Sequence, residues 1–125
     1  MDKRVAETAA HWWADFLRHA GPMDNGELGM VAIMGKMAQK QALAGITPEQ
    51  ADVFEACLVA VLEPLSERYT TVGVDYHPDG ILQDAAKRAG IDVDYALPWK
   101  TMMWIESGKI SVAVGYGARA TPPEG

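Results

Sequence analysis

The fold is decided by the stretch WKTMMWIESGKISVAVGY, residues 99–116. Two runs of alternating side chains flank Ser107 and Gly108, and this pair suits a two-residue turn between antiparallel strands. With that turn in place, the expected cross-strand pairs are Glu106 with Lys109, Ile105 with Ile110, Trp104 with Ser111, Met103 with Val112, and Met102 with Ala113. The sequence therefore predicts a β-hairpin with one fixed register.

The two faces of this hairpin differ in composition. Successive side chains of a strand point to opposite faces, so one face is apolar and forms a predicted core: Thr101, Met103, Ile105, Ile110, Val112 and Val114. The other face combines Lys100, Met102, Trp104 and Glu106 with Lys109, Ser111, Ala113 and Gly115. A tryptophan among small neighbours, on a face with no evident need to be apolar, indicates that this face makes a contact.

A further strand is expected over residues 69–76, where the side chains again alternate with a period of two. Val72, Val74 and Tyr76 share one face, and Thr71, Gly73 and Asp75 share the other. If this strand joins the hairpin, its small and polar residues lie on the same side as Trp104. Three occupants of that side fit the pattern: a partner protein, a second subunit, or a helix of the same chain.

The remaining segments read as helices separated by turns. Helices are expected over residues 2–19, about 27–43, 48 to about 62 after the cap signal Thr47-Pro48-Glu49-Gln50, and about 80–89 before Gly90. The prediction is one α+β domain over residues 1–118, followed by a flexible C-terminal tail over residues 119–125. Its three N-terminal helices precede a strand, a helix and the hairpin, and helices cover one face of a small antiparallel or mixed sheet.

Charge and cysteine content exclude several classes of function. Among the 125 residues, 17 are acidic and 11 are basic. Because this excess of negative charge repels the phosphate backbone, we do not expect the protein to bind nucleic acid directly. The single cysteine, Cys57, lies on an apolar helix face and cannot form an intramolecular disulfide. No apolar run suits a signal peptide or a membrane span. We expect a cytoplasmic protein that binds neither nucleic acid nor membrane.

Three titratable residues, Asp75, His77 and Asp79, are spaced so that they could bind a metal or act in general-base catalysis. Two carboxylates and an imidazole could ligate a divalent metal or hold a general base, which supports an alternative reading as a small-molecule-binding or metal-dependent hydrolytic protein. Helix capping accounts for the same residues more simply, because polar side chains and proline commonly begin helices. We expect no cofactor and no catalytic residue, since no serine has a paired histidine and Cys57 lies in apolar surroundings.

Four strings carry a resemblance: VDYHPDGIL over residues 74–82, AGI over 89–91, PWKTMMWI over 98–105 and GYGA over 115–118. Together they resemble a group of small uncharacterised proteins of tailed phages and prophages, mainly over residues 74–118. The resemblance implies a genetic context and transfers no catalytic residue. If a phage encodes the protein, its expected location is the host bacterial cytoplasm. Small accessory phage proteins often bind and disable a bacterial defence effector, for example a CRISPR complex, so the context suggests an inhibitor.

The leading expectation is a non-catalytic protein-binding module, specifically a phage-type inhibitor of a bacterial defence system such as an anti-CRISPR protein. It would act by occupying a surface of a host defence effector. The expected contact residues are Lys100, Met102 and Trp104, with Asp75 and Glu106 at the rim. The remaining alternative is a self-assembling structural protein, in which the same face joins copies of the chain in a homo-oligomer.

Overall fold

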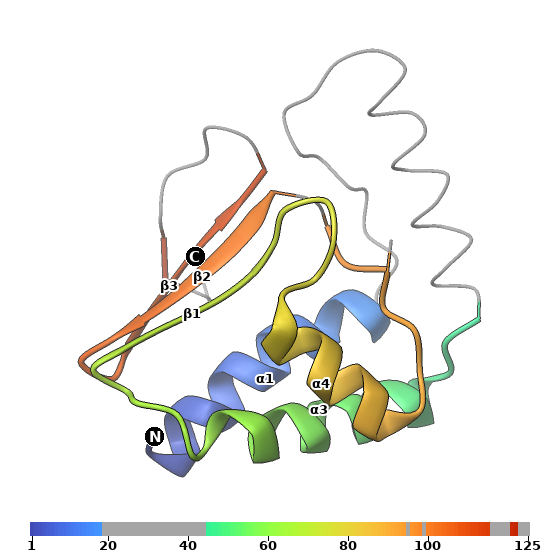
Figure 1. Cartoon of the computed structure of the whole chain (residues 1–125), viewed down its shortest axis with the longest axis horizontal. Coiled ribbons are helices and arrows are strands. Elements are labelled where there is room, and N and C mark those ends of the chain that lie inside the picture. Colours follow the sequence, from blue (N-terminus) through green and yellow to red (C-terminus); the bar gives the residue numbers. More distant parts are fainter. Residues whose placement is uncertain (19–44, 95, 99, 116–120, 123–125) are drawn as a thin grey trace.

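The computed structural model describes residues 1–18, 45–94, 96–98, 100–115 and 121–122 (Figure 1). These residues form three helices, α1 (Lys3–Arg18), α3 (Pro48–Leu62) and α4 (Gly80–Ala89), and three strands, β1 (Tyr69–Val74), β2 (Thr101–Glu106) and β3 (Lys109–Val114). The protein is α+β, as the sequence predicts. The helix predicted over residues 27–43 lies outside the described residues.

The three strands form one antiparallel sheet in the order β1-β2-β3. In the hairpin, Trp104 pairs with Ser111 and Glu106 pairs with Lys109, so the predicted register is confirmed. Ser107 and Gly108 have φ angles of 50° and 75°, the positive values that a tight hairpin turn requires. Strand β1 pairs with β2, which confirms that the strand beginning at residue 69 joins the hairpin.

The described helices lie on one side of this sheet (Figure 1). Helix α1 contacts β3, α4 contacts β1, and α3 packs against both α1 and α4. The largest side chains between these elements are fully buried: Trp13, Phe54, Leu58, Leu62, Leu82, Leu97, Met103 and Ile105. The core therefore fills the space between the helices and one face of the sheet. No helix in the described ranges has an apolar stretch long enough to cross a membrane.

Local signals explain where the helices begin and end. Thr47 accepts a hydrogen bond from the Gln50 amide while the Gln50 side chain accepts one from the Thr47 amide, which is a complete capping box. Asp79 is the N-cap of α4, and Gly90 ends that helix with a φ of 73°. These ends agree with the predicted boundaries.

Strand β1 ends at Val74, two residues earlier than predicted, and Tyr76 is 41% exposed rather than on the core face. The reason is a turn in which the chain folds back on Gly73. The Asp79 amide donates to the Gly73 carbonyl, and the Gly73 amide donates to the Asp79 carboxylate. These bonds draw the intervening residues out of the sheet.

Two positions of β3 also differ from the predicted division into faces. Val114, expected in the core, is 40% exposed because it lies at the end of the edge strand β3. Ala113, expected on the opposite face, is buried, and it carries only a methyl group beside its cross-strand partner Met102. Beyond β3, Thr121 exchanges two backbone hydrogen bonds with Val112.

Candidate functional site

The sheet face that points away from the core is the candidate site, and we call it the outer face. Its central residues are Thr71 and Gly73 of β1, Met102 and Trp104 of β2, and Ser111 and Ala113 of β3. Trp104 stands between Thr71 and Ser111, and Met102 stands between Gly73 and Ala113. Trp104 and Met102 are therefore neighbours on the central strand and are flanked by small residues on both sides.

Trp104 and Met102 are both partly exposed, whereas their neighbours Met103 and Ile105 on the same strand are fully buried. Within the described ranges, neither Trp104 nor Met102 belongs to the core cluster or packs against it, although Ile110 of the adjacent strand does. An indole combines a large apolar surface with one hydrogen-bond donor. Here the indole lies outside the core cluster of the described residues, and part of its surface is exposed.

Gly73 lets the Met102 side chain lie across β1. A Cβ atom at position 73 would be 2.7 Å from both Sδ and Cε of Met102. The missing side chain leaves room for the thioether against the β1 backbone, and a Cβ atom there would force the flexible end of Met102 to move. Methionine adapts its shape to irregular partners, which suits a contact surface.

Lys100 is held at the end of the outer face, just before β2. Its φ of 56° is unusual for a residue with a side chain, and its amide donates to the Asp75 carbonyl over 2.9 Å. Its ammonium pairs with the Asp75 carboxylate and lies 4.5 Å from the centre of the Tyr76 ring. The structure thus brings the predicted residues Lys100 and Asp75 together beside Met102.

The opposite end of the outer face contains Glu106, which is exposed and paired with Lys109 on one side and Tyr69 on the other. Tyr69 is 60% exposed. The sequence analysis did not select Tyr69 or Tyr76 as site residues. The signal that could have identified them is that these tyrosines stand at the two ends of the strand predicted over residues 69–76.

The cluster of Asp75, His77 and Asp79 is divided among separate partners. Asp75 pairs with Lys100, and the His77 ring lies 3.8 Å from the Asp94 carboxylate. Asp79 accepts hydrogen bonds from the amides of Leu82 (3.0 Å) and Gly73 (2.8 Å). Among the described residues, no three histidine, cysteine or acidic side chains are grouped so that they could hold a metal ion.

Asp79 therefore has a structural role, which is the capping role expected from the sequence. Burial raises the pKa of its carboxyl group above the ordinary value of 3.8, although the amides of Leu82 and Gly73 oppose this shift. The carboxylate connects the end of β1 to the start of α4. It thereby fixes the turn that carries Asp75 and Tyr76.

No protein-family model matches this chain, and a search of curated proteins finds no similar sequence. The functional argument therefore rests on the chemistry of the surfaces.

Proposed function

We propose that this protein is a non-catalytic protein-binding module that docks through the outer face of its sheet. The observation that supports this most is the position of Trp104 and Met102, which lie side by side on the central strand, partly exposed and away from the core cluster of the described residues. Tryptophan is the residue type most enriched among those that dominate binding energy at protein interfaces. The sheet also fixes the backbone positions of both residues before binding, which reduces the entropy lost on association.

The dimensions of the outer face indicate how far the contact must extend. Each strand has six residues, so the face is about 20 Å long, and three strands make it about 10 to 15 Å wide. That footprint of roughly 300 Å² is well below the roughly 800 Å² per partner of a stable interface. The docked surface must therefore include both ends of the face, with Lys100, Asp75 and Tyr76 at one and Glu106 and Tyr69 at the other.

The proposed partner is a bacterial defence effector, and the proposed activity is that of a phage-type inhibitor such as an anti-CRISPR protein. The support for this partner is the resemblance of residues 74–118 to small phage and prophage proteins. Inhibition by occupying a surface needs no catalytic group and no cofactor. It requires only a stable scaffold and a docking surface, and the bacterial cytoplasm is where such a target would be met.

The test is a transformation assay in a bacterium with an active CRISPR system that targets the incoming plasmid. We expect the wild-type protein to restore transformation, and Trp104→Ala to lose this effect, because the largest apolar contact is removed. Val53→Ala is the matched control, because Val53 is an apolar residue of α3 that is 48% exposed and lies outside the sheet. Circular dichroism would establish that both variants are folded.

Two outcomes would contradict the proposal. If Trp104→Ala protects the plasmid as well as the wild type does, the outer face is not the docking surface. If the wild type protects no plasmid in strains with different CRISPR types, this class of target is wrong.

Light scattering tests the alternative of self-assembly. Self-assembly would appear as a molecular mass that rises with protein concentration in the wild type and equals that of a monomer in Trp104→Ala.

A further inference from the structure

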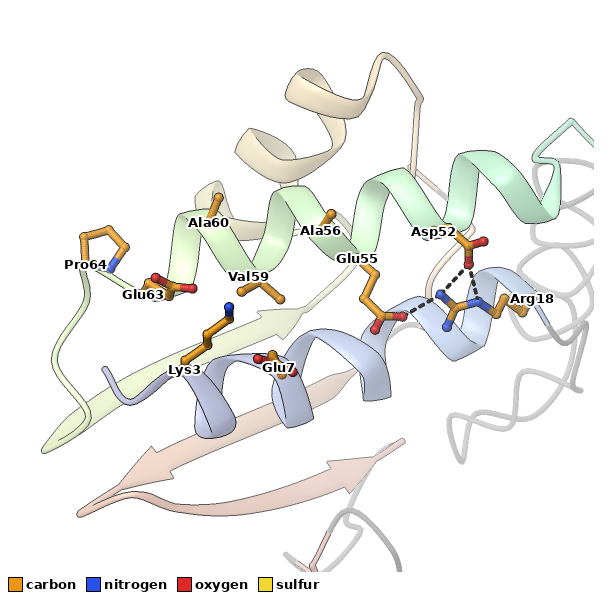
Figure 2. A pocket seen from close by; sticks show the side chains of 10 residues that line it. All are labelled: Lys3, Glu7, Arg18, Asp52, Glu55, Ala56, Val59, Ala60, Glu63 and Pro64. Atoms are coloured by element: carbon orange, nitrogen blue, oxygen red, sulfur yellow. Dashed lines mark hydrogen bonds and ion pairs between the residues drawn. The ribbon is translucent and has the colours of Figure 1, made fainter.

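A second surface lies in the helical layer, where an open groove of about 1030 Å³ runs between α1 and α3 (Figure 2). The two helices are antiparallel along this groove. Lys3 at the start of α1 lies near Glu63 at the end of α3, and Arg18 at the end of α1 pairs with Asp52 near the start of α3 (Figure 2). The groove extends from Asp52 to Glu63, a distance of roughly 17 Å along α3. This length accommodates about three turns of another helix.

The floor of the groove is apolar and shallow. Ala56, Val59 and Ala60 of α3 line it, and Ala56 and Ala60 are both exposed. These alanines are four residues apart, so their methyl groups are adjacent on one side of α3. Small side chains allow the backbone of a second helix to approach closely. The opposite side of α3 faces the core, with Phe54 and Leu58 fully buried.

The walls of the groove carry an excess of negative charge. Glu7, Asp52, Glu55 and Glu63 supply four carboxylates, against the two cations Lys3 and Arg18. The charge of Arg18 is already neutralised, because its guanidinium hydrogen-bonds Asp15, Asp52 and Glu55. Glu7 and Glu63 form no ion pair with any described residue. A partner with positive charge on its flanks complements this surface.

We propose that the groove between α1 and α3 binds an amphipathic helix of a partner protein. The helix presents small apolar residues to Ala56 and Ala60 and carries lysine or arginine on its flanks, opposite Glu7 and Glu63. This mode of recognition uses the helical layer and is independent of the outer face of the sheet. The protein thus has two docking surfaces of different chemistry.

The experiment measures fluorescence anisotropy of labelled 18-residue helical peptides mixed with the full chain. The probe has an alanine and leucine stripe flanked by lysines, and a matched peptide has glutamate at every lysine. We expect saturable binding of the lysine peptide that weakens as salt is added, and much weaker binding of the glutamate peptide. Ala60→Arg should weaken binding of the lysine peptide by about tenfold or more, since it places a charged side chain at the centre of the contact.

Thr8→Arg is the control, because it adds the same charge at an exposed position of α1 that does not line the groove. It should bind the lysine peptide within about twofold of the wild type, as expected when a surface charge is added outside the contact. Trp104→Ala should also bind normally, which separates this result from the test of the outer face. Equal binding by Ala60→Arg and the wild type, equal binding of the two peptides, or no saturable binding would each overturn the proposal. Self-association that Ala60→Arg abolishes would assign the groove to a second copy and would overturn it as well.

Discussion

Asp79 shows how a single side chain can determine the local path of the chain. Its carboxylate accepts hydrogen bonds from the first turn of α4 and from Gly73 in β1, and its own amide donates to the Gly73 carbonyl. The strand end and the helix start are therefore held by the same residue. The turn between them places Asp75 and Tyr76 against Lys100.

Replacing Asp79 with alanine should destabilise the protein by about 2 to 3 kcal/mol. Loss of a helix cap costs about 1 kcal/mol, and leaving the partly buried Gly73 amide unpaired adds about 1 to 2 kcal/mol. Urea denaturation measures the free energy of unfolding. Asp84→Ala is the control, because Asp84 is an exposed carboxylate of α4 whose ion pair with Arg88 should contribute less than about 1 kcal/mol. Equal losses in the two variants would contradict the structural role of Asp79.

The raised pKa of Asp79 predicts the sign of one pH effect. Because burial raises this pKa in the folded state, the native protein holds the proton more tightly than the unfolded chain does. Protonation of the Asp79 carboxyl group therefore stabilises the folded state. This pH-dependent stabilisation is complete below the ordinary pKa of 3.8 and is lost as the pH rises through the folded-state pKa. The stability of the wild type relative to Asp79→Asn should fall over this range in urea titrations at successive pH values. A relative stability that rises with pH would contradict the predicted direction.

At the scale of elements, Arg18 connects α1 to α3. Its guanidinium is 2.8 Å from Asp52 and 3.0 Å from Asp15, and it also hydrogen-bonds Glu55. Partial burial acts to lower the pKa of Arg18, but the hydrogen bonds to Glu55, Asp52 and Asp15 outweigh it and raise the pKa. Arg18 is therefore charged at every pH at which the protein folds, and it offsets the repulsion among three carboxylates.

Arg18→Ala should reduce the free energy of unfolding by about 1 kcal/mol, near the upper end for partly exposed ion pairs. The loss should become smaller as salt is added, since salt screens the repulsion among the remaining carboxylates. Thermal and urea unfolding at low and high salt measure this difference. Arg18→Lys is the matched variant, because it retains the charge and should retain part of the stability. A loss that does not depend on salt would indicate that packing of the arginine stem, rather than charge, joins the helices.

At the scale of the whole molecule, one side of the sheet faces the core and the other is the partly buried outer face. Trp13 of α1 is fully buried, and its ring makes an edge-to-face contact with Trp12 at 5.0 Å. Trp104 lies on the outer face, away from the core cluster. Two tryptophans of one small domain thus belong to different layers and should contribute very differently to folding.

Trp13→Ala should cost about 3 to 5 kcal/mol, the range for removing a large aromatic side chain from a core. Trp104→Ala should cost about 1 kcal/mol, the upper end for a cross-strand pair, since Trp104 is partly exposed and lies outside the core cluster of the described residues. Denaturation by urea, followed by circular dichroism, gives both values. A cost for Trp104→Ala as large as that for Trp13→Ala would mean that the indole on the outer face is part of the folding core.

The sequence by itself determined the features that depend on neighbours along the chain. The hairpin register follows from the alternation around Ser107 and Gly108, and the start of α3 follows from Thr47 and Gln50, because these bonds join residues only a few positions apart. The same alternation predicts that Met102 and Trp104 lie on the outer face of the sheet. Most of the candidate site could therefore be predicted before its geometry was known.

Only the tertiary structure decided the contacts that join distant residues. Arg18 meets Asp52 across 34 positions, and Lys100 meets Asp75 and Tyr76 at the end of the sheet. The groove between α1 and α3 also arises from residues far apart in the sequence. No local pattern encodes such contacts, because they depend on how the helices and strands pack around a shared core, and packing is a property of the whole chain.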